Sequence, residues 1–261
     1  MVIKHNEEFN RGYNSICELK SQMQMEIGVI KLIKDEQYLN DNMLERAVLL
    51  IEGKVTFTYN NTSKTVERLS CFDENPICLH LPKGMKFEIV AVSDSELIYQ
   101  GVENDTAFEP VLFDKSDTVS DVFGKDTLKN TSIRTVRTIL DDDTAPHSNM
   151  VMGEVINHPG KWSSYPPHSH VQPEVYYYKF LPETGFGFSL IDEQAYKIEH
   201  QSASLIHGNV VHPQCSAPGY AMYYVWMIPH TKEKRWLKDR IFDPKHTWLL
   251  DENPKIWPDN K

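Results

Sequence analysis

Two histidines separated by one residue, His168 and His170, precede the glutamate Glu174 in the stretch PPHSHVQPEVYYYKF. If this stretch is extended, the two histidines project from one face, because alternate side chains of a strand point the same way. Imidazole nitrogen and carboxylate oxygen suit Zn, Mn, Fe, Co or Ni, and three or four such ligands with an open position make a catalytic site. His212, in HGNVVHPQ, is the candidate for a fourth ligand. The pattern predicts a divalent metal site.

The same stretch also has a purely structural interpretation. A chain with eleven histidines contains an HxH pair by chance about as often as not, so the pair could be a histidine-rich turn packed beside Tyr165 and the prolines. Glu174, the later His212 and a glycine between two aromatic runs favour the metal site, because together they complete a ligand set.

Short runs rich in β-branched and aromatic residues recur along the chain and must position these side chains. Turn-forming clusters such as NNTSK, VSDS and LPETG separate them, which is the spacing typical of an all-β sandwich or barrel. Helical periodicity is weak, with a modest signal over residues 10–24. The runs are AVLLIEG, VTFTY, FEIVAV, ELIYQG, VYYYKF, GFGFSLI and AMYYVWMI.

A polar stretch over residues 114–143 divides the chain into two strand-rich halves, and we expect a linker there with one strand in TSIRTVRTIL. The halves look like loose copies of one another. Glu45 precedes AVLLIEG as Glu174 precedes VYYYKF, and LPKGMKF in the first half corresponds to IHGNVVH in the second. Two divergent copies of a strand-rich unit predict a double barrel.

The composition limits the classes of partner and compartment. The 261 residues carry a formal net charge of -10, which argues against nucleic-acid binding because phosphate contacts need clustered Lys and Arg. The amino-terminal stretch MVIKHNEEFNRGYNSICELK lacks the apolar core of a signal peptide, and no segment reaches a membrane-spanning length of apolar residues. Four scattered cysteines without a CxxC pair fit a reducing environment. We expect a cytoplasmic protein without nucleic-acid or membrane partners, with exposed aromatic strands that favour a homo-oligomer.

The order HxH, Glu, Gly and distant His resembles the two motifs of the cupin superfamily, small β-barrels that hold a divalent metal on three histidines and one glutamate. LPKGMKF resembles the second motif with Phe87 in place of the histidine, and no HxH precedes Glu45. The resemblance implies an all-β bicupin of two tandem double-stranded β-helix (jelly-roll) barrels. The expected domains are an amino-terminal barrel without metal ligands at residues 1–125 and a metal-binding barrel with a carboxy-terminal extension at residues 126–261.

A narrower resemblance rests on GKWSSYPPHSH, EVYYYKF, APGYAMYYVWMIP and DPKHTW, with VLLIEGKVTF and LPKG in the first half. These segments are similar to the bacterial 5-deoxy-glucuronate isomerase family of inositol catabolism, which shares its bicupin architecture with 5-keto-4-deoxyuronate isomerase of pectin breakdown. The resemblance implies that His168, His170, Glu174 and His212 bind the metal, with zinc expected first and Mn, Fe, Co or Ni as alternatives. The short link VQP before Glu174 is closer to the pectin-pathway enzyme, so both substrates stay open.

The implied reaction is an aldose to ketose isomerisation of a small deoxy-uronate. It converts 5-deoxy-D-glucuronate into 2-deoxy-5-keto-D-gluconate, with 5-keto-4-deoxyuronate (4-deoxy-L-threo-5-hexosulose-uronate) as the alternative substrate. Such a reaction needs a cation near the carbonyl and a general base that moves a proton. The sequence offers several groups for the base and, for the substrate, a tyrosine and two cations that suit its carboxylate. The candidate bases are Glu174, Tyr176, Tyr178 and His207, and the candidate substrate-binding residues are Lys161, Tyr178 and Arg235.

Other classes of function remain open on this fold, because a fold does not fix an activity. Bicupins include metal-dependent oxygenases and sugar-binding proteins. An intact set of four ligands favours an enzyme over a passive binder, whereas an oxygenase would need iron and consume oxygen. Cys215, three residues after His212, offers a thiol, but a small buried residue is the preferred interpretation.

Overall fold

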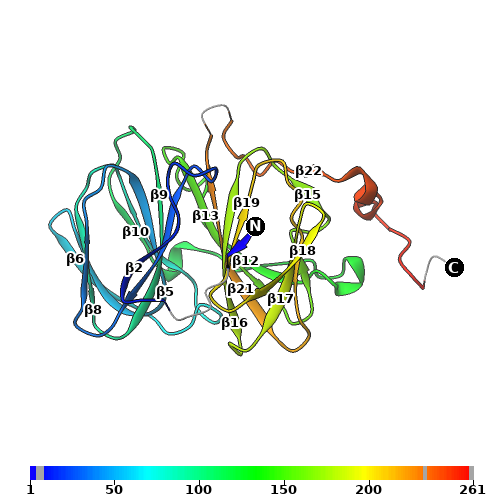
Figure 1. The fold of residues 1–261 in the computed structure, drawn as a ribbon, viewed down its shortest axis with the longest axis horizontal. Helices are drawn as coiled ribbons and strands as arrows, with labels where there is room; N and C mark the ends of the chain where they lie inside the picture. The colour runs from blue at the N-terminus through cyan, green and yellow to red at the C-terminus, as the bar shows by residue number, and fades with distance from the viewer. Residues whose placement is uncertain (4–8, 232–233, 259–261) are drawn as a thin grey trace.

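The computed structural model describes residues 1–3, 9–231 and 234–258. Its described part consists of β-strands and three short 3₁₀ helices, η1 (Lys115–Asp117), η2 (Leu128–Asn130) and η3 (Pro244–Leu250). None of these helices has the length and apolarity needed to cross a membrane. The strands form two halves that lie side by side in Figure 1. The all-β prediction is confirmed, but the helical signal over residues 10–24 was wrong, since a strand forms there.

The first half is one nine-stranded sheet, whose strands are β2 (Gly12–Cys17), β3 (Glu26–Leu32), β4 (Gln37–Asn40), β5 (Glu45–Tyr59), β6 (Thr62–Arg68), β7 (Ile77–Leu81), β8 (Phe87–Ala91), β9 (Ser95–Val102) and β10 (Val111–Phe113). Strand β5 pairs first with β7 and β9 and then with β6 and β8. The partners change near Gly53, whose φ is +111° and where a Cβ would lie 2.3 Å from the Ser95 Oγ. Glycine is required there because other residues would be strained.

The second half contains a seven-stranded sheet in the order β1 (Val2–Ile3), β19 (Ala203–Ile206), β16 (Glu174–Leu181), β21 (Ala221–Pro229), β13 (Met150–Asn157), β12 (Arg134–Leu140) and β11 (Asp121–Phe123). The predicted strand in TSIRTVRTIL is therefore present as β12. Strands β1 and β11 come from the first 125 residues and pair with β19 and β12. The domain division at residue 125 stays a prediction, and this sheet takes strands from both sides of it.

A smaller sheet and a two-stranded pair complete the second half. They are a four-stranded sheet of β14 (Trp162–Ser163), β20 (Gln214–Ser216), β17 (Phe186–Ile191) and β18 (Gln194–Glu199), and the pair β15 (His168–Ser169) and β22 (Ile241–Phe242).

Apolar side chains form three core clusters, and the alternation of strand side chains distributes them. On β5, Val48 packs inside the first half, whereas Leu49 packs in the cluster shared with the second half. On β16, Tyr176 packs inside the second half, whereas Tyr177 joins the shared cluster. Burial of one large apolar side chain stabilises the fold by about 1.5–3 kcal/mol. The shared cluster therefore joins the two halves firmly.

Two buried ion pairs cross between the halves. Arg68 of β6 pairs with Glu154 of β13 at 2.7 Å, and both side chains are fully buried. Lys179 of β16 pairs with Glu96 of β9 at 3.2 Å. A buried charge that loses its partner costs about 3–5 kcal/mol. These pairs therefore oppose sliding of the seven-stranded sheet against the first half.

Candidate metal centre

His168, His170, Glu174 and His212 meet at one end of the second half. His168 lies in β15 and His170 directly follows it, Glu174 begins β16, and His212 lies between β19 and β20. All four are buried, with exposed fractions between 1% and 8%. Ligand atoms of His170, Glu174 and His212 lie within 4.8 Å of one another, and the ring centroids of His168 and His212 are 5.5 Å apart. The structure brings together the four residues selected from the sequence.

Two loops cross at this site and fix the histidines on them. The backbone N–H of Asn209 donates to the carbonyl oxygen of His170 at 2.6 Å. At Gly208 the loops approach so closely that a Cβ would lie 2.0 Å from the carbonyl oxygen of Val171. A residue without a Cβ is needed for this approach. The loop that ends at His212 is thereby held against the VQP link.

Each histidine ring is oriented through its Nδ1 atom, which lies near a backbone carbonyl two residues away. A carbonyl oxygen only accepts, so Nδ1 carries the hydrogen and donates it, and the neutral ring presents the lone pair of Nε2. Histidines that bind a metal are usually supported in this way. The distances are 2.8 Å from His168 Nδ1 to Pro166 O, 2.9 Å from His170 Nδ1 to Gln172 O and 2.7 Å from His212 Nδ1 to Val210 O.

The donor set fits a divalent cation. Nε2 of His170 and Nε2 of His212 lie 3.2 Å and 3.1 Å from Oε2 of Glu174. Because the ring hydrogens are on Nδ1, these two nitrogens and the carboxylate oxygen all present lone pairs to one another, which is unfavourable without a positive charge between them. Three imidazoles and one carboxylate suit zinc and other first-row divalent metals.

The pKa shifts at the site favour the forms that coordinate metals. Burial lowers the pKa of His168 to about 4, with further lowering by the neighbouring His212. Burial alone would raise the pKa of Glu174, but hydrogen-bond donors and positive charge on the side of His170 and His212 lower it well below its usual range, and a bound cation would take over this role where their Nε2 atoms present lone pairs. Neutral imidazole and ionised carboxylate are the forms that bind metals.

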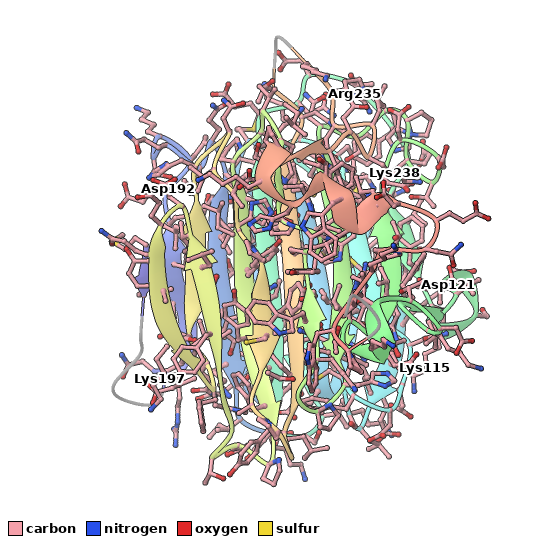
Figure 2. The ribbon with its side chains drawn as sticks, turned by 90° about the vertical axis from the view of Figure 1, so that its right-hand side faces the viewer. Lys115, Asp121, Asp192, Lys197, Arg235 and Lys238 are labelled. Atoms are coloured by element: carbon pink, nitrogen blue, oxygen red, sulfur yellow. The ribbon has the colours of Figure 1, made fainter. Side chains whose placement is uncertain are left out.

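A cavity of about 580 Å³ opens over the four residues. Its walls include the rings of Tyr176, Tyr224 and Trp226 and the cations Arg134, Lys238 and Arg240. Figure 2 looks onto this side of the molecule, where Lys238 is labelled beside the carboxy-terminal segment that crosses in front of the strands. The volume is in the range of small-molecule sites.

Of the other candidate bases, Tyr176 is part of the cavity wall and His207 is not. Tyr176 lines the cavity, and its hydroxyl donates to Glu174 Oε2 at 2.9 Å and lies 3.1 Å from Ser164 Oγ. Burial and the charge of Glu174 raise the pKa of Tyr176 well above its usual value, so its phenol stays protonated. His207 is exposed, and it is absent from the cavity wall of the described chain.

The three residues selected as substrate-binding candidates have other surroundings, and none of them is among the described residues that line the cavity. Arg235 pairs with Asp142 at 2.7 Å. Tyr178 is fully buried, and its hydroxyl lies 2.9 Å from Ser204 Oγ and 2.6 Å from Gln214 Oε1. Lys161 lies in the turn that precedes β14.

Sequence reasoning missed the cations that do line the cavity. Arg134 is the first residue of β12, within the predicted strand TSIRTVRTIL, and Arg240 immediately precedes β22. Their only signal in the sequence was position, a cation at the start or edge of a strand. Which face of β12 meets the cavity is decided by its pairing register with β11 and β13.

Cys215 lies in β20, where it is opposite Trp162 of β14 and Phe188 of β17. Its side chain is partly exposed rather than buried as predicted, and partial burial raises the pKa of its thiol. A raised pKa disfavours the thiolate, which is the nucleophilic form. All four cysteines are free thiols. The structural interpretation of Cys215 is the better one.

Comparisons with known proteins agree with this architecture. The 5-deoxy-glucuronate isomerase of Bacillus licheniformis is 28% identical to the chain, with 94% of this chain and 96% of that protein covered. Among solved structures, an IolB-like protein from Salmonella typhimurium matches with a TM-score of 0.85 at 19% identity, over 96% of this chain and 99% of that one. A cupin 2 conserved barrel domain protein from Leptotrichia buccalis matches with a TM-score of 0.54 at 15% identity, over 88% of this chain and 96% of that one.

The two structural matches have low sequence identity and support the cupin-like fold alone. The sequence comparison goes further, because the model of the KduI/IolB family matches residues 1–249. That match includes both halves and the four buried residues of the candidate metal centre. The chain therefore belongs to the KduI/IolB family.

Proposed function

We propose that the chain is a metal-dependent aldose–ketose isomerase that converts 5-deoxy-D-glucuronate into 2-deoxy-5-keto-D-gluconate in inositol catabolism. His168, His170, Glu174 and His212 hold the divalent metal, for which zinc is the first expectation. The observation that carries the proposal is the set of histidines, each anchored through Nδ1, around one buried carboxylate. The relative named 5-deoxy-glucuronate isomerase supports the choice of substrate.

The reaction moves a carbonyl from the first carbon of the sugar to the second. A proton leaves the second carbon, and a proton is returned to the first, so no oxidant or reductant is consumed. A bound divalent metal supplies positive charge that stabilises the negative charge developing on the substrate oxygens. The remaining requirements are a shaped cavity, a positioned carboxylate and a group that carries the proton.

Residues of the cavity meet the first two requirements. Tyr176 donates to Oε2 of Glu174 and so fixes the orientation of that carboxylate. The rings of Tyr176 and Tyr224 lie with their centroids 4.8 Å apart on the cavity wall. Such apolar faces exclude water from the reacting carbons and strengthen the electrostatic interactions beside them.

Glu174 stays our candidate for the base, because it lines the cavity and carries an ionised carboxylate. Its lowered pKa weakens it as a base and suits it as a ligand, so the two roles compete. Tyr176 has the opposite property, a phenol that remains protonated and can donate. Isomerisation in D₂O distinguishes a proton that exchanges with solvent from one that is transferred directly between the two carbons.

The test is an assay of purified protein loaded with one divalent metal at a time. We expect NMR to show conversion of 5-deoxy-glucuronate into the ketose and loss of conversion on chelation. Preferential turnover of 5-keto-4-deoxyuronate would instead assign the pectin-pathway substrate. Turnover of neither substrate overturns the isomerase proposal, and oxygen consumption by the iron-loaded protein would indicate an oxygenase.

Metal content provides a second test that does not depend on the substrate. His168→Ala and His212→Ala are expected to lower the bound metal strongly, because each removes one imidazole of the set. The matched control is His207→Ala, which removes an exposed histidine five residues before His212. Equal metal content in all three variants would show that the metal centre is wrongly placed.

A further inference from the structure

Three cationic side chains line the cavity, and they differ in their partners. Lys238 pairs with Asp141 at 3.0 Å and with Asp143 at 2.7 Å, so its charge is neutralised. Arg134 and Arg240 line the same cavity, and neither forms an ion pair with any carboxylate in the described ranges. Two guanidinium groups without an acidic partner therefore face the space over the candidate metal centre.

Arg134 is held in place from two sides. Its Nη1 donates to the carbonyl oxygen of Ser132 at 2.8 Å, and its guanidinium lies 5.9 Å from the ring centroid of Phe123. Phe123 is also its partner across the β11–β12 pair. These contacts use one nitrogen and one face of the guanidinium. They position the group and leave its remaining N–H donors available to a ligand.

The position of Arg240 follows from the strand after it. Phe242 of β22 pairs with His168 of β15, and their ring centroids lie 5.7 Å apart. Arg240 lies two residues before Phe242 and directly before β22. Both side chains line the cavity.

The two arginines are close enough to influence each other and the site. Burial lowers the pKa of Arg134, and the charge of Arg240 lowers it further, while Tyr224 acts in the opposite direction. Arg240 also contributes to the lowered pKa of His168. Asp121 lines the same wall, but it is exposed, and within the described part of the chain it forms no ion pair with Arg134 or Arg240. An anion between the arginines would relieve their repulsion.

We propose that Arg134 and Arg240 bind the carboxylate of the substrate and thereby select aldoses that carry an acid group at the end opposite the aldehyde. Arginine suits this role because its planar fork donates two parallel hydrogen bonds to a carboxylate. The inference rests on the proposed function, in which the aldehyde end of the same molecule lies at the His/Glu centre. It replaces Lys161 and Arg235 as the expected carboxylate partners.

The test compares an acid with its neutral amide. Calorimetry on the metal-loaded protein measures binding of D-glucuronate and D-glucuronamide to wild type, to Arg134→Gln, to Arg240→Gln and to the double variant. We expect wild type to prefer the acid, each single variant to weaken acid binding roughly 10-fold or more, and the double variant to bind both probes equally. The KM for 5-deoxy-glucuronate should rise in parallel, with unchanged metal content.

The matched control is Arg235→Gln, which removes a guanidinium that pairs with Asp142 and lies outside the cavity wall. It should keep the preference for the acid. Arg240 is exposed, so Arg240→Gln is expected to fold normally, and thermal unfolding checks every variant. A merely structural role of the arginines would change stability or metal content without removing the discrimination between acid and amide.

The outcomes separate this inference from the proposed function. If wild type isomerises 5-deoxy-glucuronate but the double variant keeps the KM and the preference for the acid, the inference fails and the function stands. If wild type isomerises neither uronate but shows a preference for the acid that needs the arginines, the anion site stands and the function fails. Equal binding of both probes by wild type, or binding of neither, overturns the inference.

Discussion

The two halves of the chain place opposite charges at equivalent positions of the fold. Arg46 of β5 pairs with the last residue of β7, as Glu174 of β16 pairs with the last residue of β19. Phe87 and His212 each follow that strand end by six residues. The residues six and four positions before Arg46 are asparagines, and the residues six and four positions before Glu174 are histidines. The equivalent pairs are Asn40 and His168, Asn42 and His170, Arg46 and Glu174, and Phe87 and His212.

The first half supplies its own cation at this place. Arg46 is fully buried, and its guanidinium donates to the carbonyl oxygen of Pro82 and to Asn40 Oδ1 and lies 5.7 Å from the ring centroid of Phe87. The second half has an ionised carboxylate among three imidazoles there, a donor set that suits a cation from outside. These four residues decide whether the scaffold fills this position with a side chain, as Arg46 does in the first half, or leaves it for a metal, as the proposed function requires in the second.

The largest expected effect comes from giving the second half the residue of the first. His212→Phe removes one ligand and places an apolar ring beside Glu174, as Phe87 does beside Arg46. We expect loss of bound metal and a fall in kcat of roughly 10³-fold or more, since metal charge stabilisation is worth several kcal/mol. Metal analysis and the isomerase assay measure both quantities. Full metal content and activity in this variant would show that His212 is not a metal ligand.

The reverse exchange tests the first half. Arg46→Glu places a carboxylate among Asn40, the Pro82 carbonyl and Phe87 without a cation, and an uncompensated buried charge costs about 3–5 kcal/mol. Arg46→Met keeps an unbranched side chain of similar length and leaves the Pro82 carbonyl without its donor, which costs about 1–3 kcal/mol. Urea unfolding measures the stability of the two variants, and Arg46→Glu should be the less stable one. If Arg46→Glu were no less stable than Arg46→Met, this position of the first half would not require a positive charge.

Local patterns in the sequence predicted the strands and grouped His168, His170 and Glu174, whereas the resemblance to the cupin motifs completed the set with the distant His212. HxH and Glu174 are close in sequence, and strand runs show their own periodicity. The sequence pattern aligns Glu45 with Glu174, whereas the strand register aligns the next residue, Arg46, with Glu174. In a strand, a shift of one residue moves a side chain to the opposite face. The structure places Arg46 inside the first half and directs Glu45 toward the second.

The cations of the cavity could not be selected from the sequence for a related reason. Arg235 and Arg134 are both plausible partners of a carboxylate by residue type. Arg235 meets Asp142, whereas Arg134 enters the cavity because β12 pairs with β11 and β13 in a particular register. A long-range contact decides the surroundings of Arg235, and the pairing register of neighbouring strands decides those of Arg134, and residue type alone shows neither.

Glu45 provides a test with a smaller effect. Burial alone would raise its pKa, but hydrogen bonds from His80, Ser148 and the Asn149 N–H lower it below 4.5. A carboxyl whose pKa is lower in the folded state stabilises the fold above its unfolded pKa, and this contribution is lost as pH falls through the folded pKa. We therefore expect metal-free wild type to lose stability below about pH 4.5 more steeply than Glu45→Gln.

Urea unfolding of both proteins at several pH values measures this difference. Glu45→Gln should also bind metal normally at neutral pH, because Glu45 faces the other half rather than a site equivalent to Glu174. Loss of metal in this variant, or identical pH profiles of the two proteins, would contradict the corrected correspondence.

The smallest expected effect concerns two equivalent turns, at Gly84 in the first half and at Asn209 in the second. Gly84 N–H donates to Asn42 O at 3.2 Å, as Asn209 N–H donates to His170 O, and both turn residues have positive φ, 73° and 65°. Asparagine is one of the few residues with a Cβ that adopt this conformation readily. A Cβ at Gly84 would meet Met43 Sδ at 3.1 Å, and Met43 is 65% exposed and able to move.

Exchanging these two residues, as Gly84→Asn or Asn209→Gly, should therefore change the free energy of unfolding by no more than about 0.5 kcal/mol. Gly84→Val should cost about 1–2 kcal/mol, because a β-branched residue is strained at positive φ. Chemical unfolding of the three variants shows whether the two turns have equivalent backbone conformations although their residues differ. A large loss of unfolding free energy in Asn209→Gly would mean that the asparagine side chain, and not the turn alone, holds the loop of His212. The two halves would then differ in their turns as well as in their charges.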